Sequence, residues 1–139
     1  MNIEGKIAVV TGGASGLGKA TAEMVVAKGG KVAVLDLNEE LAQATAAELG
    51  EAKAYQVNVT DDASVTKAIE AVKSDFGAIH INVNCAGIGA ASRTVGKDGA
   101  LDINKFNFIV QVNLIGTFSV LSKCAVSYTH LRAHETAQY

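Results

Sequence analysis

The stretch TGGASGLG at residues 11–18 decides the fold, because it joins a short β-branched run to an alanine-rich segment. The run before it, KIAVVT at 6–11, is typical of a buried strand, and residues 17–28 are typical of a helix that ends at Gly29. Glycines at this junction let the backbone turn tightly and let an anion approach the free N–H groups at the helix start. The stretch therefore predicts a strand–loop–helix unit that can hold the pyrophosphate of a dinucleotide.

Beyond this unit, strand-like and helix-like segments alternate along the chain. Residues 31–36, 54–57 and 79–84 are predicted strands, 87–101 is a predicted loop, and Asn38, Thr60 and Asp102 stand where helix N-caps are expected. The three further helices have the apolar stripes Leu41, Thr45 and Leu49; Val65, Ile69, Val72 and Phe76; and Phe106, Ile109, Val110, Leu114, Phe118 and Leu121. Regular alternation predicts an α/β fold, a Rossmann-type doubly wound parallel sheet with strand order 3-2-1-4 and helices on both faces.

Asp36 ends the second predicted strand, 18 residues after Gly18. A carboxylate at this place can accept hydrogen bonds from the ribose hydroxyls of a dinucleotide, and it repels a 2′-phosphate. Neither Ala14 nor Leu37 offers a base that would hold that phosphate, so the pattern favours NAD over NADP. The purely structural alternative for Asp36 is a loop carboxylate that caps a helix.

Composition excludes several classes of function. The 139 residues are 49% hydrophobic but only 5% aromatic, which suits a single domain whose sheet is buried on both faces by Ala, Val, Ile and Leu. The net charge of -2 comes without a basic block, so we expect no nucleic-acid partner, and the apolar runs look too short for a membrane partner. The two cysteines show neither disulfide nor metal-ligand spacing, so we expect a cytoplasmic protein.

Four features together resemble the short-chain dehydrogenase/reductase (SDR) family over residues 1 to about 125. They are TGGASGLG at 11–18, Asp36, NCAG at 84–87, and Asn113 within QVNLIGTF. The string VNCAGIGAASRT further resembles the type 2 3-hydroxyacyl-CoA dehydrogenase branch of that family. The resemblance implies an NAD cofactor and hydride transfer to or from a secondary alcohol.

The resemblance also assigns roles to residues. Ser15 and Leu17 would line the pyrophosphate, Asn58 and Val59 would flank the adenine, and Asn113 would be a catalytic residue that steadies a water in the proton relay. The full set of implied cofactor-binding residues is Gly12, Ser15, Gly16, Leu17, Gly18, Asp36, Asn58, Val59, Cys85, Ala86 and Gly87. The plainer alternatives are a polar helix residue for Asn113, small-residue packing for Cys85, and a strand end without chemistry for His80.

Three asparagines need separate comment. Asn58 stands where the family usually has Asp, although an amide oxygen can still accept a hydrogen bond. Asn84 is followed by Cys85 rather than by a second Asn, a variant that the 3-hydroxyacyl-CoA dehydrogenase branch shares. Asn82 puts an amide in a predicted buried strand, where an unpaired amide costs about 1–3 kcal/mol.

The final stretch, CAVSYTHLRAHETAQY at 124–139, does not continue the family pattern. The family's catalytic serine and Tyr-x-x-x-Lys pair follow a further strand, whereas Tyr128 is followed at that spacing by Arg132. His130 and His134 have a spacing that can clasp a metal, but no third ligand is evident, so we expect no metal. We interpret 1–125 as a partial NAD-binding Rossmann domain and 126–139 as a non-family tail, a sequencing or gene-prediction artefact.

Two functions remain open at this point. The first is a fragment of an NAD-dependent oxidoreductase that acts on a small alcohol, ketone or acyl-CoA, including 3-hydroxyacyl-CoA, with a tyrosine as general base assisted by a lysine. Its intact parent would be a homo-oligomer, and this chain, without that pair, would be inactive. The second is a non-catalytic nucleotide-binding or interaction module, which the same glycine loop would serve.

Overall fold

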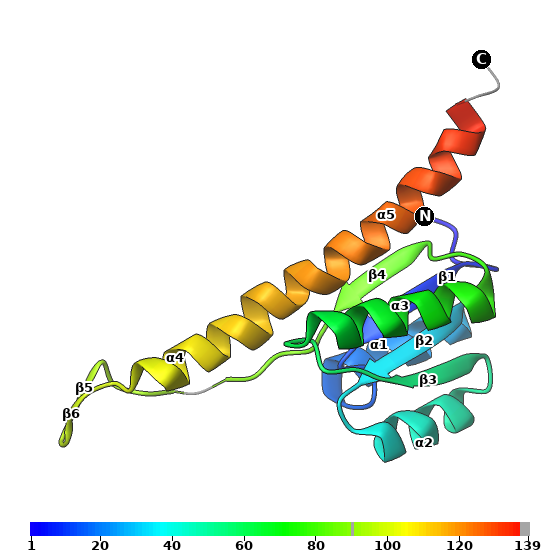
Figure 1. The fold of residues 1–139 in the computed structure, drawn as a ribbon. Coiled ribbons are helices and arrows are strands. Elements are labelled where there is room, and N and C mark those ends of the chain that lie inside the picture. Colours follow the sequence, from blue (N-terminus) through cyan, green and yellow to red (C-terminus); the bar gives the residue numbers. More distant parts are fainter. Residues whose placement is uncertain (90, 137–139) are drawn as a thin grey trace.

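The computed structural model describes the backbone of residues 1–89 and 91–136 and the side chains of 1–89 and 91–127. Its centre is a parallel sheet of β1 (Ile7–Thr11), β2 (Lys31–Asp36), β3 (Ala52–Gln56) and β4 (Ile81–Asn84). The spatial order is β3-β2-β1-β4, so the predicted strand order is confirmed (Figure 1). All four strands point the same way, and their carboxyl ends therefore meet at one edge of the sheet.

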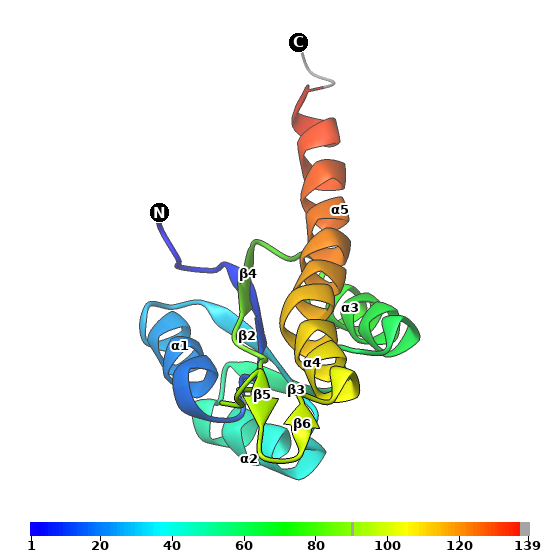
Figure 2. The ribbon, with the colours of Figure 1, turned by 90° about the vertical axis from the view of Figure 1, so that its left-hand side faces the viewer.

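Alternation along the strands divides the core into two hydrophobic clusters, one on each face. Ala8, Val10, Val32 and Val34 pack beneath α1 (Gly16–Ala27) and α2 (Glu39–Leu49). On the other face, Val9 and its neighbours pack beneath α3 (Asp62–Phe76) and α5 (Thr117–Thr136). Figure 2 shows α1 on one side of the sheet and α3 with the long C-terminal helix on the other. The expected coverage of both faces is confirmed.

Several local predictions were displaced by one or two residues. The N-cap of α3 is Asp61, whose side chain accepts from the Ala63 N–H, and not Thr60. Thr60 instead directs its N–H and hydroxyl to Asn58, which keeps it in the preceding turn. In α2 the buried face is Ala42, Thr45 and Ala46, while Leu41 is exposed, so the predicted stripe was out of phase at its first position.

The predicted loop at 87–101 contains a short antiparallel hairpin of β5 (Val95–Gly96) and β6 (Gly99–Ala100). After it, α4 (Ile103–Val110), the π-helical η1 (Gln111–Gly116) and α5 form one continuous helix that crosses the sheet (Figure 1). The predicted boundary at 125/126 falls inside α5. Side chains from residue 128 on, including Tyr128, lie outside the described residues, so the interpretation of the tail stays a prediction.

The apolar stripe predicted for the long helix does not form its buried face. Phe106, Leu114, Phe118 and Leu121 are exposed, whereas the buried positions are Val112, Gly116, Val120, Cys124 and Ser127. Large apolar side chains lie on both sides of this helix, so a 3.6-residue period alone does not show which side meets the sheet. By length and mean hydropathy (1.5), residues Ile103–Ser127 also pass as a membrane span, contrary to the expectation from apolar runs. A core-covering helix passes the same test.

Candidate functional site

A cavity of about 510 Å³ lies at the carboxyl ends of the strands, where parallel α/β sheets bind ligands. Every residue predicted to bind the cofactor lines it. The lining consists of Gly12, Ser15, Gly16, Leu17, Gly18, Leu35, Asp36, Leu37, Val57, Asn58, Val59, Thr60, Cys85, Ala86, Gly87, Ile88, Phe108 and Val112. The structure therefore brings five segments, which are apart in sequence, to one site.

The glycine loop is shaped by close backbone approaches. Gly12 has a φ of +61°, and a Cβ there would lie 2.9 Å from the Ala86 nitrogen. A Cβ on Gly18 would lie 2.0 Å from the carbonyl oxygen of Gly12, which is far inside contact distance. Side chains at these two positions would push α1 away from β1 and from the loop after β4. The two glycines thus keep the start of α1 at the floor of the cavity.

The N-terminus of α1 has the features of an anion site. Ser15 occupies the N-cap position, but its side chain makes no capping hydrogen bond, and the first turn contains no acidic residue. The positive end of the helix dipole is consequently not compensated by a carboxylate of its own first turn. Ser15, Gly16 and Leu17 all line the cavity at this end.

Asp36 joins the glycine loop to the end of β2. One carboxylate oxygen accepts from the Ala14 N–H at 3.2 Å and the other from the Asn38 N–H at 3.0 Å. Asp36 therefore also acts as the structural loop carboxylate considered above, since its hydrogen bonds hold the glycine loop at the end of β2. Its position in the cavity lining beside the exposed Leu37 also leaves it adjacent to any ligand.

The opposite wall is the loop after β4, and two side chains hold it. The Thr11 hydroxyl accepts from the Ala86 N–H at 3.2 Å. The Asn113 amide pairs with the backbone of Ile88: its oxygen accepts from the Ile88 N–H and its nitrogen donates to the Ile88 carbonyl, both at 2.8 Å. Asn113 lies in η1 and is not among the residues that line the cavity, and its hydrogen bonds fix a wall residue. Its catalytic role stays a prediction.

Asn58 and Val59 form the third wall, after β3. The Asn58 side-chain oxygen accepts from the N–H and hydroxyl of Thr60, and its backbone N–H donates to the Ser64 hydroxyl at 3.0 Å. These bonds shape the turn that leads into α3. The proposed contact of Asn58 with an adenine stays a prediction.

Sequence reasoning missed seven residues of the lining: Leu35, Leu37, Val57 and Thr60, which adjoin predicted residues, and Ile88, Phe108 and Val112. Ile88 directly follows the predicted NCAG segment, so extending that segment by one residue would have included it. Phe108 and Val112 reach the site only because the helix from Ile103 returns across the sheet after the hairpin, and no local signal encodes that return.

The remaining singled-out residues lie elsewhere. His80 Nδ1 accepts from the Ile7 N–H at 3.1 Å, at the opposite edge of the sheet, and burial lowers its pKa. The Cys124 thiol is buried, which raises its pKa to about 12. Within residues 1–89 and 91–127, no group of three His, Cys, Asp or Glu side chains is arranged to hold a metal.

Comparisons with known proteins agree with this geometry. The family model described as "short chain dehydrogenase" matches residues 6–133. The chain is 40% identical over 123 residues to 3-hydroxyacyl-CoA dehydrogenase type-2 of Bos taurus, covering 86% of this chain and 47% of that protein. It is 37% identical over 135 residues to the 3-oxoacyl-[acyl-carrier-protein] reductase FabG of Escherichia coli, covering 96% and 53%. The chain thus spans about half the length of the curated relatives that it matches.

A solved structure is similar to this chain in both fold and sequence. The 3-ketoacyl-(acyl-carrier-protein) reductase of Brucella melitensis, crystallised with NADH, superposes with a TM-score of 0.87 at 31% sequence identity. The alignment covers 96% of this chain and 54% of that one.

Proposed function

Because the chain belongs to the short-chain dehydrogenase family, we propose that it forms the NAD-binding part of an oxidoreductase that moves a hydride between a secondary alcohol and the cofactor. The observation that carries this proposal is the cavity at the carboxyl ends of the strands. Its lining unites the glycine loop, the acidic end of β2 and the loop after β4. A nicotinamide dinucleotide, when bound, supplies the hydride acceptor or donor.

The residues present fit such a dinucleotide. The pyrophosphate would lie at the N-terminus of α1, where Gly12 and Gly18 leave no Cβ in the cradle. The ribose nearest β2 would be held by Asp36, and the nicotinamide end by the wall from Cys85 to Ile88, which Asn113 fixes. The cavity of about 510 Å³ falls in the range of small-molecule sites.

Asp36 favours NAD over NADP in this proposal. Its carboxylate lies in the cavity lining, and Leu37 beside it offers no positive charge for a 2′-phosphate. Because Asp36 also holds the Ala14 N–H, its removal would disturb the loop as well as the charge. The substitution Leu37→Arg alone adds a cation while keeping that bond. We expect Leu37→Arg to strengthen NADP binding and Asp36→Ala/Leu37→Arg to shift the preference further.

The substrate class follows from the relatives rather than from the cavity. Their names point to 3-hydroxyacyl or 3-oxoacyl thioesters, and we propose this class for the whole protein. We also propose a cytoplasmic protein, supported by the free thiols of Cys85 and Cys124, and a homo-oligomer, supported by the exposed apolar side of the long helix.

Residues 1–139 contain no Tyr-x-x-x-Lys pair, and this observation favours the second candidate, a nucleotide-binding module without turnover, for the isolated chain. General acid–base catalysis needs a group within hydrogen-bond reach of the alcohol proton, and it contributes about 10²–10⁴-fold. We expect residues 1–139 to bind NAD without oxidising 3-hydroxyacyl-CoA.

The test is calorimetry of residues 1–139 with NAD and with NADP, followed by NADH absorbance with 3-hydroxyacyl-CoA. Binding of NAD by the folded chain supports the cofactor proposal, and its absence would contradict it. Equal affinity for NAD and NADP would contradict the assignment of Asp36. Turnover that Tyr128→Phe abolishes would show that the stretch at 124–139 is catalytic.

A further inference from the structure

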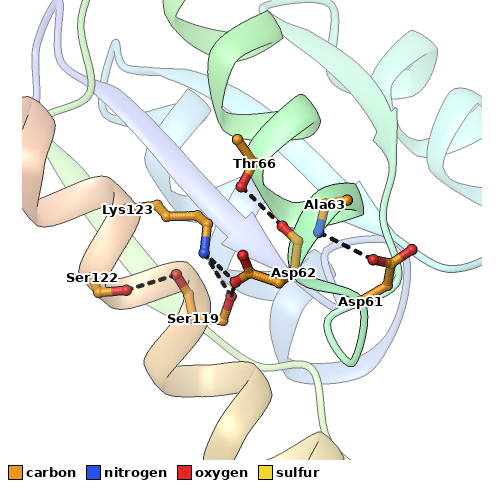
Figure 3. Close-up of polar contacts among 7 residues, drawn as sticks. All are labelled: Asp61, Asp62, Ala63, Thr66, Ser119, Ser122 and Lys123. Atoms are coloured by element: carbon orange, nitrogen blue, oxygen red, sulfur yellow. Dashed lines mark hydrogen bonds and ion pairs between the residues drawn. The ribbon is translucent and has the colours of Figure 1, made fainter.

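A polar cluster joins the start of α3 to α5, outside the cavity. Asp62, the first residue of α3, accepts from the Lys123 ammonium at 2.5 Å and from the Ser119 hydroxyl at 3.1 Å (Figure 3). Lys123 also contacts the Ser119 hydroxyl at 3.1 Å. These three residues, here named the Asp62 cluster, are the polar link between the two helices. The Lys123 ammonium also holds the pKa of the Asp62 carboxyl below its usual value.

The same long helix makes two further attachments, one and two turns before the cluster. At Gly116 a Cβ would lie 2.8 Å from Val59 Cγ2, so the helix backbone rests directly on the wall after β3. At Asn113 the side-chain amide holds the Ile88 backbone of the opposite wall. Val59 and Ile88 both line the cavity. The helix therefore bridges two walls of the site, and its position decides whether both are held.

The attachment at Asn113 is the one that most needs support. It lies in the π-helical η1 and is exposed to solvent, so its two hydrogen bonds compete with water. The outer side of the helix contacts no other described element there, since Leu114, Ile115 and Phe118 are exposed. A small slide or rotation of the helix would separate the Asn113 amide from Ile88. Asp62 is fixed at the other end, because the turn before it is tied by Asn58 and capped by Asp61.

We propose that Lys123 and Ser119 are positioning residues, which anchor the helix to α3 through Asp62 and so hold Asn113 against the Ile88 wall of the cofactor site. The inference rests on the proposed function for its meaning, because the wall matters only if the cavity takes a dinucleotide. The structural part of the inference does not depend on the ligand. It says that loss of the Asp62 cluster also weakens the hydrogen bonds between Asn113 and Ile88.

The chain offers a matched control for this cluster. Lys19 and Glu48 form an ion pair at 2.7 Å that joins α1 to α2 on the other face of the sheet. Lys19 and Lys123 are both partly covered, and their partners are both exposed. Surface ion pairs contribute little to global stability, so Lys123→Gln and Lys19→Gln should both leave the melting temperature within about 2 °C of the parent. Only Lys123→Gln should increase hydrogen exchange at the Ile88 amide.

The experiment is amide hydrogen exchange on residues 1–139 by NMR, with calorimetry of NAD binding beside it. In Lys123→Gln we expect the exchange rate of the Ile88 amide to rise about five-fold, because the segment around it opens locally more often. The amides of β1 and β2 should keep their protection. NAD affinity should fall with it. Lys123→Arg should restore protection at Ile88 in part, and Asp62→Asn, which is nearly isosteric, should repeat the effect if Lys123→Gln fails to fold.

Two outcomes overturn the inference. One is exchange at Ile88 that rises no more in Lys123→Gln and Asp62→Asn than in Lys19→Gln. The other is a uniform rise across the strands with a lower melting temperature, which would mean a merely structural role. If the parent chain fails to bind NAD while Ile88 is still loosened selectively, the proposed function fails and the positioning of Asn113 stands.

Discussion

The two faces of the sheet are closed in different ways. On the face of α1 and α2, contact is made by small side chains and by glycines that let backbone meet backbone, as at Gly18 and Gly12. On the face of α3 and the long helix, apolar packing is joined by three further attachments: the Asp62 cluster, the Asn113–Ile88 pair and Gly116 against Val59. We expect the first kind to hold the anion cradle more firmly than the second holds Asn113.

Buried polar atoms without a hydrogen-bond partner are also distributed unequally between the two faces of the sheet. Among the described residues, three buried side-chain atoms lack a hydrogen-bond partner: Asn82 Nδ2, Asn84 Oδ1 and Ser127 Oγ. By alternation with Ile81 and Val83, which pack toward α1 and α2, the two amides of β4 face the side of α3 and α5. Among the described residues, buried polar atoms without a partner therefore occur only on the face of α3 and α5, whereas the buried Thr45 hydroxyl on the other face donates to the Ala14 carbonyl.

The comparison predicts its largest effect for alanine at the two buried helix glycines. Gly18→Ala places a Cβ 2.0 Å from a backbone oxygen, which no side-chain movement relieves, so we expect a loss of about 3 kcal/mol or more in the free energy of unfolding and no NAD binding. Gly116→Ala brings its Cβ to 2.8 Å from Val59 Cγ2 and 3.2 Å from the Val59 carbonyl oxygen, a milder clash that the helix propensity of alanine partly offsets, so the loss should be smaller, about 1–2 kcal/mol. Urea unfolding of both variants measures the difference. Equal losses would show that both faces are closed by backbone contact.

The second effect concerns the two amides of β4. Asn84 donates to Asn82 at 2.8 Å, so Asn82→Val alone removes an acceptor and leaves a buried donor, which should cost about 1–3 kcal/mol. The double variant Asn82→Val/Asn84→Val removes both partners and should be about as stable as the parent or more stable. Urea unfolding of single and double variants tests this. A double variant that is less stable than the single one would mean that these amides have partners that the comparison overlooks.

The same contrast explains what the sequence could predict. The segment from β1 to β4 follows strict alternation, with glycines and N-caps at nearly every boundary, so its topology, Asp36 and the glycine loop could be placed from local pattern alone. The buried face of the long helix could not, because large apolar residues lie on both of its sides, and Phe106 and Leu114 proved exposed. The Asp62 cluster was also hidden, since it joins residues 57 and 61 positions apart. No periodicity records such a contact.

A third and smaller effect is a pH dependence at the edge opposite the cavity. His80 Nδ1 must be unprotonated to accept from the Ile7 N–H, and burial, with Lys6 nearby, lowers the pKa of His80 from 6.5. A lowered folded-state pKa means that the unfolded chain binds more protons, so stability rises with pH through this window. The contribution is complete above pH 6.5 and is lost as the pH falls through the folded pKa. Its size should be about 1 kcal/mol, that of one hydrogen bond.

The measurement is the free energy of unfolding between pH 5 and pH 8, compared with that of His80→Gln. Glutamine offers an acceptor that does not titrate, so the variant should lose the step at mildly acid pH. A step that persists in His80→Gln would assign it to another group.

The smallest effect changes no stability and compares the two cysteines. Cys85 lines the cavity and is partly exposed, whereas Cys124 is fully buried on the core-facing side of α5, where burial raises its pKa to about 12. At pH 8 a thiol reagent should therefore modify one cysteine in the native chain and both in urea, and Cys85→Ser should abolish the native reaction. Because NAD would cover Cys85, a concentration ten times the Kd should slow its reaction about ten-fold, while NADP at the same concentration should slow it less. Modification of Cys124 in the native chain at a rate near that of Cys85 would show that the long helix opens far more readily than its side-chain attachments imply.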